Sequence, residues 1–325
     1  MKALVLHQLT GIDGLKLEHD WAEPQLQPGT VLIDVAAAAL NFPDLLILKG
    51  QYQFKPPLPL IPGMEMAGTI AAVGEGGTRW KVGDRAIAYA SGAAAERAVV
   101  PQERLLPLPS TLDFEAGCGV NVTYFTTYHA FKQRAQLAPG ETVLVLGAAS
   151  GVGTTAVELA KQMGATVIAA ASTPAKLEVA RKLGADHVVN YTNEDLRERV
   201  KEITGGKGVD VVYDAVGGPY AEPAVRSLAW KGRYLVIGFA AGEIPKIPIN
   251  LLLLKGAALV GVFFGSFAER EPQVQQQNVR ELWALFEAGK LKPVVGAVYP
   301  LADYAAAFGS MEQRRAMGKV VLRIG

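Results

Sequence analysis

One stretch of the sequence constrains the fold more than any other. An apolar segment, 142–146, leads into a run of mostly small residues, Gly147–Gly153, and then into a long amphipathic segment. A second apolar segment, 166–170, follows it. This is the order of a strand, a glycine-rich turn, a helix and another strand. Because the first strand is apolar at nearly every position, it is typical of a parallel strand that is covered on both faces. The stretch therefore predicts a βαβ unit.

The turn of this unit predicts an anion site. Around Gly147, Ser150, Gly151, Val152 and Gly153, no bulky side chain keeps the backbone from approaching a pyrophosphate group. The helix expected from about 151 offers unpaired N–H groups and the positive end of its dipole. The pattern has one residue more than G-x-G-x-x-G, and Ser150 stands where a Gly might be expected, so the strand–turn–helix context supports the dinucleotide site. The alternative is a turn that only packs helix against strand.

The end of the second strand predicts NADP(H) in preference to NAD(H). An NAD site usually has an acidic residue there, about 20 residues past the glycines, whereas 170–173 contain none. Ser172, Lys176 and Tyr191, the last at the end of the expected third strand, offer a hydroxyl, a cation and a phenol to a 2′-phosphate. The alternative is that Ser172 caps the next helix, with Pro174 in its first turn, and that Lys176 is solvated.

Composition limits the classes of function. The 325 residues, 50% of them hydrophobic, are enough for two domains with their own cores. A net charge of +1 gives no indication of nucleic acid or of an anionic membrane surface as a partner. The single cysteine, Cys118, excludes an intramolecular disulfide and a Cys-rich zinc site. The most apolar region, 251–264, is too short to span a bilayer, and the apolar run of the first residues is shorter than a signal peptide requires, so none is expected. We expect a soluble, cytoplasmic protein.

The spacing of the strands predicts the fold class. Up to about residue 110, short strands between Gly and Pro turns indicate a partly open β-barrel. These strands are expected at 2–6, 31–38, 66–73, 85–89 and 96–100. Further on, strands alternate with helices, which predicts an α/β fold, a Rossmann-type doubly wound parallel sheet with right-handed crossovers. Its strands are expected at 142–146, 166–170, 187–190, 210–214 and 233–238, with a last one at 257–263.

The remaining segments complete two domains. Helices are expected just after Asn41, within 112–133 and over about 274–288, and the β-rich tail, 293–325, is too small to fold alone. The expected domains are 1–121, completed by 265–325, and a dinucleotide-binding domain, 122–264. Ligands of such sheets bind beyond the carboxyl ends of the strands. One rim should therefore carry the glycine turn and Ser172, together with Val216, Gly238 and Phe239.

Several motifs resemble those of the medium-chain dehydrogenase/reductases, and within them the zinc-free quinone oxidoreductases, the zeta-crystallin branch. The motifs that carry this resemblance are Gly140-Glu141, Leu144, 148–153, Glu158, Lys161, 41–44, 50–59, 62–68 and 265–272. Ser150 and Glu158 depart from the Gly and Gln of the family pattern. The resemblance implies a GroES-like first domain, a Rossmann-type second domain and NADP(H) as cofactor.

The residues themselves argue against zinc. Zinc-dependent relatives carry Cys in the segment that holds Asn41, and Gly-His-Glu where this chain has Gly63-Met64-Glu65. An amide, a thioether and the carboxylate of Asp44 make a poor zinc site, so we expect no metal. Without a metal, alcohol oxidation lacks its electrophile. A quinone or enone accepts hydride because its π-system delocalises the charge, and the enzyme then mainly positions the reactants.

The resemblance also implies roles in the first domain. It places Asn41 near the nicotinamide and the substrate, where its amide could donate a hydrogen bond to the acceptor carbonyl; the alternative is a helix N-cap. Asp44 orients Asn41 or only lies in the first helical turn. Tyr52 contacts the quinone or packs against the proline-rich loop. Glu65 is a residual acid/base group or, by the preferred interpretation, pairs with a buried Arg.

Further cofactor contacts follow from the same resemblance. Thr127 resembles a nicotinamide contact, with helix packing as the alternative. Phe239, Phe264 and Gly265 are expected to line the cofactor's rim through their backbone. Lys319 resembles a basic residue that reaches the pyrophosphate, and a surface lysine is the alternative.

Together these observations predict an NADPH-dependent, zinc-independent reductase of quinones. The close alternative is a reductase of activated C=C bonds, in an enone or an enoyl thioester. A different class, an NADPH-binding structural protein of the crystallin kind, also remains open. Because an apolar edge strand at 257–263 invites pairing and in the family often joins its symmetry mate, a homodimer is expected.

Overall fold

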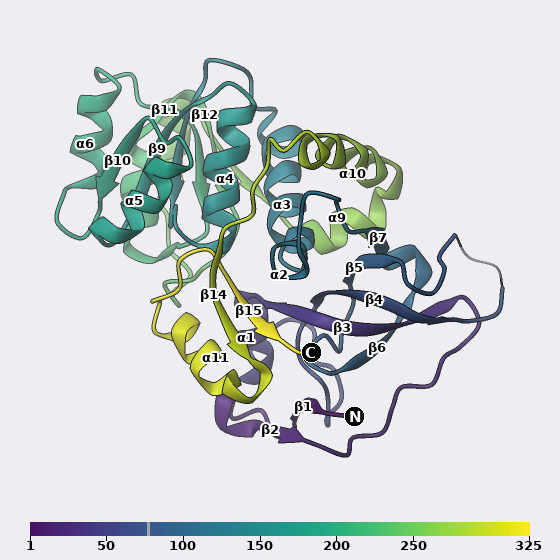
Figure 1. Ribbon diagram of the computed structural model, residues 1–325. Helices are drawn as coiled ribbons and strands as arrows, with labels where there is room; N and C mark the ends of the chain where they lie inside the picture. The colour runs from purple at the N-terminus through teal and green to yellow at the C-terminus, as the bar shows by residue number, and fades with distance from the viewer. Residues whose placement is uncertain (77–78) are drawn as a thin grey trace. The chain divides into compact units, whose positions relative to one another are not determined.

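The structure is a computed structural model that describes residues 1–76 and 79–325. The chain forms two compact units (Figure 1). Unit 1 contains Met1–Val122 and Trp283–Gly325, and unit 2 contains Thr123–Leu282. The C-terminal tail thus packs with the N-terminal segment. No helix in the described ranges is both long enough and apolar enough to cross a membrane.

Unit 2 is built on a six-stranded sheet in the order β10-β9-β8-β11-β12-β13. Every neighbouring pair of strands is parallel, which confirms the predicted doubly wound sheet. The strands are β8 (Thr142–Leu146), β9 (Thr166–Ala171), β10 (His187–Asn190), β11 (Val209–Asp214), β12 (Leu228–Val236) and β13 (Ala258–Gly261). The apolar runs seen in the sequence form the middle of this sheet, where both faces are covered.

Helices cover both faces of the unit 2 sheet. On one face, Leu144 and Tyr234 belong to a cluster with residues of α6, α7 and α8. On the other face, the ring of Tyr213 lies 5.4 Å from that of Phe131 in a π-helical turn, η3. The helical elements are α3 (Val120–His129, in this unit from Thr123), η3 (Ala130–Ala135), α4 (Gly151–Gln162), α5 (Pro174–Lys182), α6 (Leu196–Ile203), η4 (Gly218–Tyr220), α7 (Ala221–Arg226), α8 (Asn250–Lys255), α9 (Phe264–Arg270) and α10 (Pro272–Glu287, in this unit to Leu282).

Unit 1 contains a seven-stranded, mostly antiparallel sheet in the order β14-β15-β3-β4-β5-β7, with β6 also paired to β3, and a ribbon of β1 and β2. The strands are β1 (Ala3–Leu6), β2 (Leu15–Glu18), β3 (Thr30–Leu40), β4 (Glu65–Val73), β5 (Arg85–Tyr89), β6 (Arg97–Pro101), β7 (Leu105–Pro107), β14 (Val295–Pro300) and β15 (Lys319–Arg323). Its helical elements are η1 (Gly11–Gly14), α1 (Phe42–Leu48), η2 (Gln102–Arg104), α2 (Phe114–Gly117), η5 (Leu301–Asp303) and α11 (Tyr304–Glu312). This is the expected barrel-like sheet.

The division of the chain differs from the expected boundary at 264/265. Residues 265–282 belong to unit 2, because α9 and α10 pack on α3 there. The ring of Phe267 stacks on His129 at 3.7 Å, and the Asn278 amide is hydrogen-bonded to Gln133. The tail, expected to be β-rich, also contains α11, a helix that was not predicted from the sequence. Its Ala307 and Phe308 are fully buried in the core of unit 1.

Candidate functional site

The glycine turn of unit 2 is a tight connection from β8 to α4. Gly147 takes the left-handed conformation, with φ at 69°, which favours glycine. The Ser150 N–H donates to the Gly147 carbonyl at 2.8 Å. Ser150 itself is the N-cap of α4, because its Oγ accepts a hydrogen bond from the Gly153 N–H at 3.1 Å. The serine at the position of a family glycine therefore starts the helix.

At Gly147 and Gly153 the turn has room for backbone only. A Cβ atom on Gly153 would lie 2.1 Å from the Gly147 carbonyl oxygen, and one on Gly147 would lie 2.8 Å from Cγ2 of Val216. In the first turn of α4, the N–H groups of Gly151 and Val152 have no carbonyl partner within the helix. Such a turn, with N–H groups at the positive end of a helix dipole, fits a pyrophosphate group.

Of the three residues predicted to bind a 2′-phosphate, Ser172 and Tyr191 follow the neighbouring strands β9 and β10, and Lys176 lies in α5. The ring of Tyr191 packs against that of Tyr220, at 4.2 Å. The Lys176 ammonium lies 3.4 Å from the Ser172 hydroxyl. Asn190, the residue before Tyr191, pairs with Ala171, the residue before Ser172. The expectation that Ser172 could cap the next helix is wrong, since Thr173 caps α5 by accepting from the Lys176 N–H. The Ser172 hydroxyl is thus not used as a cap.

Asp214 shapes the neighbouring part of the rim. The sequence places 214–217 at this rim but does not predict what the Asp214 carboxylate does there. Its Oδ1 accepts from the N–H groups of Val216 at 2.7 Å and Gly217 at 2.9 Å. Its Oδ2 accepts a short hydrogen bond from the hydroxyl of Tyr234. Burial raises the pKa of this carboxyl above its ordinary range. A useful signal is an acid at the last position of an apolar strand, followed by a Gly two or three residues later.

The other expected cofactor residues of unit 2 divide into two groups. Gly238 and Phe239 line a cavity of about 210 Å³ whose wall also includes Asp214 and Tyr234. Phe264 is buried and stacks on Phe125 at 5.8 Å, and Gly265 follows it at the start of α9. The residues near the cavity lie at the carboxyl end of β12, as predicted for a rim.

Thr127 occupies the interior of unit 2. It is fully buried, and its hydroxyl lies 2.9 Å from both the Thr155 hydroxyl and the Tyr213 hydroxyl. These contacts join α3, α4 and β11. The placement matches the packing alternative for Thr127, and its expected contact with a nicotinamide stays a prediction.

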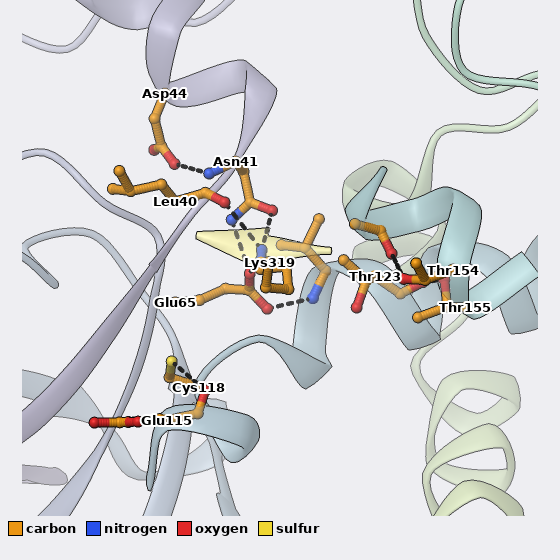
Figure 2. A network of polar contacts seen from close by, with 12 residues as sticks. Leu40, Asn41, Asp44, Glu65, Glu115, Cys118, Thr123, Thr154, Thr155 and Lys319 are labelled. Carbon is orange, nitrogen blue, oxygen red and sulfur yellow. Dashed lines mark hydrogen bonds and ion pairs between the residues drawn. The ribbon is translucent and has the colours of Figure 1, made fainter. Parts of the chain in front are cut away.

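Unit 1 contains a buried network around the ammonium of Lys319. Figure 2 shows this group between the side chains of Asn41 and Glu65 and the carbonyl of Leu40. Its Nζ lies 2.7 Å from Asn41 Oδ1, 2.9 Å from Glu65 Oε2 and 3.1 Å from Leu40 O. The other carboxylate oxygen of Glu65 accepts from the Val122 N–H at 2.6 Å.

This network corrects the preferred interpretation of Glu65 and rules out the alternative for Lys319. Glu65 pairs with a lysine, not with a buried arginine, and Lys319 is 5% exposed, not a surface residue. Because all three N–H groups of the ammonium already have acceptors in unit 1, the expected contact of Lys319 with a pyrophosphate would require one of these bonds to break.

Asp44 lies in the first turn of α1, three residues after Asn41. Its Oδ2 accepts from the Asn41 N–H at 2.7 Å, as in half of a capping box. The residue is almost completely buried, and its Oδ1 has no hydrogen-bond partner in the described part of the chain. Burial raises the pKa of Asp44 to about 7, against the effect of the Lys319 charge. Asp44 thus lies in the first helical turn and binds the backbone of Asn41, and its expected role in orienting the Asn41 side chain stays a prediction.

Tyr52 lies beside the proline-rich loop and near Asp44. Its ring centroid is 6.0 Å from that of Phe54, a residue of that loop. Burial raises the pKa of its phenol, and the charge of Asp44 adds to the shift. Burial, together with the charges of Tyr52, Glu65 and Asp44, raises the pKa of Tyr89, at the end of β5, to about 12. Two phenols are thus kept neutral close to the Asn41 network.

Within the described residues, no three His, Cys, Asp or Glu side chains are grouped so that they could hold a metal ion. Near Asn41 and Glu65, the positive charge of Lys319 occupies the position between the two side chains. Cys118 is buried, and burial raises the pKa of its thiol.

Sequence comparison now decides the family. Residues 27–110 match the family model described as an alcohol dehydrogenase GroES-like domain, and 151–287 match the one described as a zinc-binding dehydrogenase. A quinone oxidoreductase-like protein 2 homolog of Nematostella vectensis is 36% identical over 95% of this chain and 85% of that protein. Human quinone oxidoreductase is 33% identical over 99% of this chain and 97% of that protein.

The chain belongs to the medium-chain dehydrogenase/reductases. Within this superfamily it lies in the zinc-independent quinone oxidoreductase branch, as the sequence motifs predicted, and it is an oxidoreductase.

Solved structures of this superfamily have the same fold. The Escherichia coli quinone oxidoreductase complexed with NADPH is 29% identical, with a TM-score of 0.91 over 99% of this chain and all of that chain. A mycobacterial protein complexed with NADPH is 31% identical, with a TM-score of 0.92 over 99% of both chains. The CurK enoyl reductase is 29% identical, with a TM-score of 0.90 over 100% of this chain and 99% of that chain.

Proposed function

We propose that this oxidoreductase binds NADPH and reduces quinones without a metal ion. The observation that supports the cofactor most directly is the pairing of a backbone-only turn at Gly147–Gly153 with Ser172 and Lys176 at the end of the next strand. Two relatives with the same fold are solved with NADPH. The likeness to quinone oxidoreductases supports the substrate class.

The residues of unit 2 have separate tasks in this proposal. The first-turn N–H groups of α4 bind the pyrophosphate, while Gly147 and Gly153 keep the turn open to it. The Lys176 ammonium and the Ser172 hydroxyl both donate hydrogen bonds to the 2′-phosphate, and both bonds are charge-assisted because the phosphate is ionised. Tyr191 follows the neighbouring strand. When bound, NADPH supplies the hydride.

In unit 1, Asn41 is the residue proposed to contact the acceptor. One N–H of its amide donates to Glu65 at 2.7 Å. The other N–H has no acceptor in the part of the chain that the structure describes, so it is available for a quinone oxygen. Charge that develops on this oxygen during hydride transfer strengthens such a hydrogen bond. Tyr52 is proposed as a neighbouring contact of the acceptor ring.

Steady-state oxidation of NADPH, followed by its absorbance, tests this function. We expect turnover with a panel of benzoquinones and naphthoquinones, and none with saturated alcohols plus NADP⁺. Treatment with a chelator should leave the rate unchanged. Turnover that needs added zinc, or no turnover with any quinone, would refute the proposal.

The likeness to the CurK enoyl reductase favours a second candidate, reduction of activated C=C bonds. A panel of enones and enoyl thioesters separates the two, because the better substrate class has the higher kcat/KM. If the protein bound NADPH but turned over neither panel, this result would support the third hypothesis, a crystallin-like NADPH-binding structural protein.

We also propose a homodimer that forms through the edge of the unit 2 sheet. β13 pairs with β12 and lies at the end of the strand order. Leu259 on this strand is 40% exposed, and Leu253 on α8 is 80% exposed. Burying such an edge against a second copy removes an aggregation hazard. Sedimentation should show a dimer that Leu259→Arg converts to monomer, whereas a monomeric wild type at micromolar concentration would refute the proposed dimer.

The expected cytoplasmic location stays a prediction.

A further inference from the structure

The amide of Asn41 can adopt only one of its two orientations. Its Oδ1 lies 2.7 Å from the Lys319 ammonium, and its Nδ2 lies 2.7 Å from a Glu65 carboxylate oxygen. An ammonium group only donates hydrogen bonds, and a carboxylate only accepts them. A flipped amide would therefore point N–H groups at the ammonium and its carbonyl at the carboxylate. The hydrogen-bonding chemistry of Lys319 and Glu65, and not a rotamer preference of the side chain, thus determines the orientation of the Asn41 amide.

Burial increases the energetic preference for this orientation of the amide. Glu65 is fully buried, Asn41 is 6% exposed and Lys319 is 5% exposed, so water cannot replace either partner of the amide. Electrostatic interactions and charge-assisted hydrogen bonds are stronger in such surroundings than in water. A flip would lose two charge-assisted hydrogen bonds and create two repulsive contacts.

The remaining contacts of the network keep the two charges in place. Lys319 also donates to the carbonyl of Leu40, the residue before Asn41, and Glu65 accepts from the Val122 N–H. The aliphatic stem of Lys319 passes Gly119, where a Cβ atom would lie 2.9 Å from Lys319 Cγ. A larger residue at 119 would therefore displace the stem of Lys319.

We propose that Lys319 and Glu65 are positioning residues that leave Asn41 with a single free group, an amide N–H, so that the hydride acceptor must present a hydrogen-bond-accepting oxygen. The part of this inference that concerns the acceptor rests on the proposed function, whereas the positioning of Asn41 does not. It favours quinone and enone carbonyls over acceptors that lack an oxygen at this position. Lys319 takes no part in hydride transfer and acts through Asn41.

A charge-neutral variant tests the role of Lys319. In Lys319→Met, the Asn41 amide keeps Glu65 but loses the cation that holds its carbonyl. We expect the KM for a quinone to rise about tenfold, the worth of roughly one hydrogen bond, with a smaller change in kcat. The dissociation constant for NADPH should change less than about twofold. Lys49→Met is the matched control, because Lys49 pairs with Glu312 at 2.6 Å on the surface and should leave both constants unchanged.

A second variant keeps the test decisive if Lys319→Met does not fold. Glu65→Met/Lys319→Met removes both charges together, and replacement of a buried ion pair by apolar groups is often neutral for stability. The amide then has neither partner. We expect a folded protein with the same rise in KM. A folded double variant with the KM of the wild type would overturn the proposal.

The side-chain amide signals of Asn41 in an NMR spectrum give a readout that does not depend on activity. They are assigned by their loss in Asn41→Asp. In the wild type, we expect two well-separated N–H signals, one of them protected from exchange by Glu65. In the double variant, we expect the two to converge and to exchange faster. If the wild type turned over no acceptor but showed these signals, the proposed function would fail and the positioning would stand. Unchanged signals in the double variant would refute the positioning itself.

Discussion

The glycine turn of unit 2 and the Asn41 network of unit 1 are built in opposite ways. The turn uses backbone atoms from one short stretch, Gly147–Gly153, and depends on the absence of a side chain at Gly147 and Gly153. The network uses charged and amide side chains from residues 41, 65 and 319, which different strands and a helix cap bring together. The first arrangement tolerates no added atoms at its two glycines, and the second tolerates no buried charge left without its partner. Substitutions in the two regions should therefore fail for different reasons.

The largest expected effect is on stability, in the network. Glu65→Ala leaves the buried Lys319 without its counter-charge, which costs about 3–5 kcal/mol in the free energy of unfolding. Glu312→Ala removes the partner of Lys49 at the surface, where an ion pair contributes about 0–1 kcal/mol. Urea denaturation of both variants measures the difference. Equal losses would show that burial of the pair has no energetic consequence.

In the turn, added volume should abolish cofactor binding. Gly153→Val places a side chain where even a Cβ would lie 2.1 Å from the Gly147 carbonyl oxygen. The turn must then open, and we expect the affinity for NADPH to fall at least about 100-fold, or roughly 2.7 kcal/mol. Gly309→Ala in α11 is the control, because nothing lies within 4 Å of a Cβ there. NADPH fluorescence titration measures both, and wild-type affinity in Gly153→Val would contradict the role of the turn.

Asp44 gives the network a pH dependence that the turn does not have. Its folded-state pKa is raised from 3.8 to about 7, so the folded protein holds a proton that the unfolded chain has already released. The stabilisation is complete below pH 3.8 and is lost as the pH rises towards 7. The slope reaches about 1.4 kcal/mol per pH unit at most. Asp44→Asn should remove this component, so unfolding curves at several pH values should diverge between wild type and variant; parallel curves would refute it.

The smallest expected effect concerns the choice between cofactors. Lys176→Ala removes the cation beside Ser172 and should weaken NADPH about tenfold, or roughly 1.4 kcal/mol. Binding of NADH should change little, because NADH has no 2′-phosphate. Lys182→Ala, at the other end of α5, serves as the control. A loss of the same size for both dinucleotides would assign Lys176 to something other than the 2′-phosphate.

Regular, local features were predictable from the sequence. The strands 85–89, 142–146 and 187–190 were predicted at their observed limits, and α4 begins at Gly151 as expected. In these segments, apolar patterning and turn residues act within a few positions of each other. The helix α11 escaped prediction because its alanine-rich sequence shows little amphipathic pattern, although it packs against β14 and β15, the strands that flank it in the chain.

The side-chain site was less predictable. Asn41 and Asp44 could be selected because they lie together in one motif, but the partner of Glu65 lies 254 residues away and was expected to be an arginine. No periodicity connects residues so far apart, since their pairing follows from β3, β4 and β15 being neighbours in one sheet. The role of Thr173 in place of Ser172 as a helix cap depends on backbone angles at a single residue.

The stem of Lys319 passes close to Gly119, so substitutions at these two positions should be coupled in evolution. A larger residue at 119 would push the lysine stem aside and separate the cation from the amide that it holds. Among descendants of one ancestral gene, the size of residue 119 and the charge of residue 319 should therefore change together or not at all. An engineer who grafts the Asn41 motif into another scaffold has to transfer this empty space as well as the visible side chains.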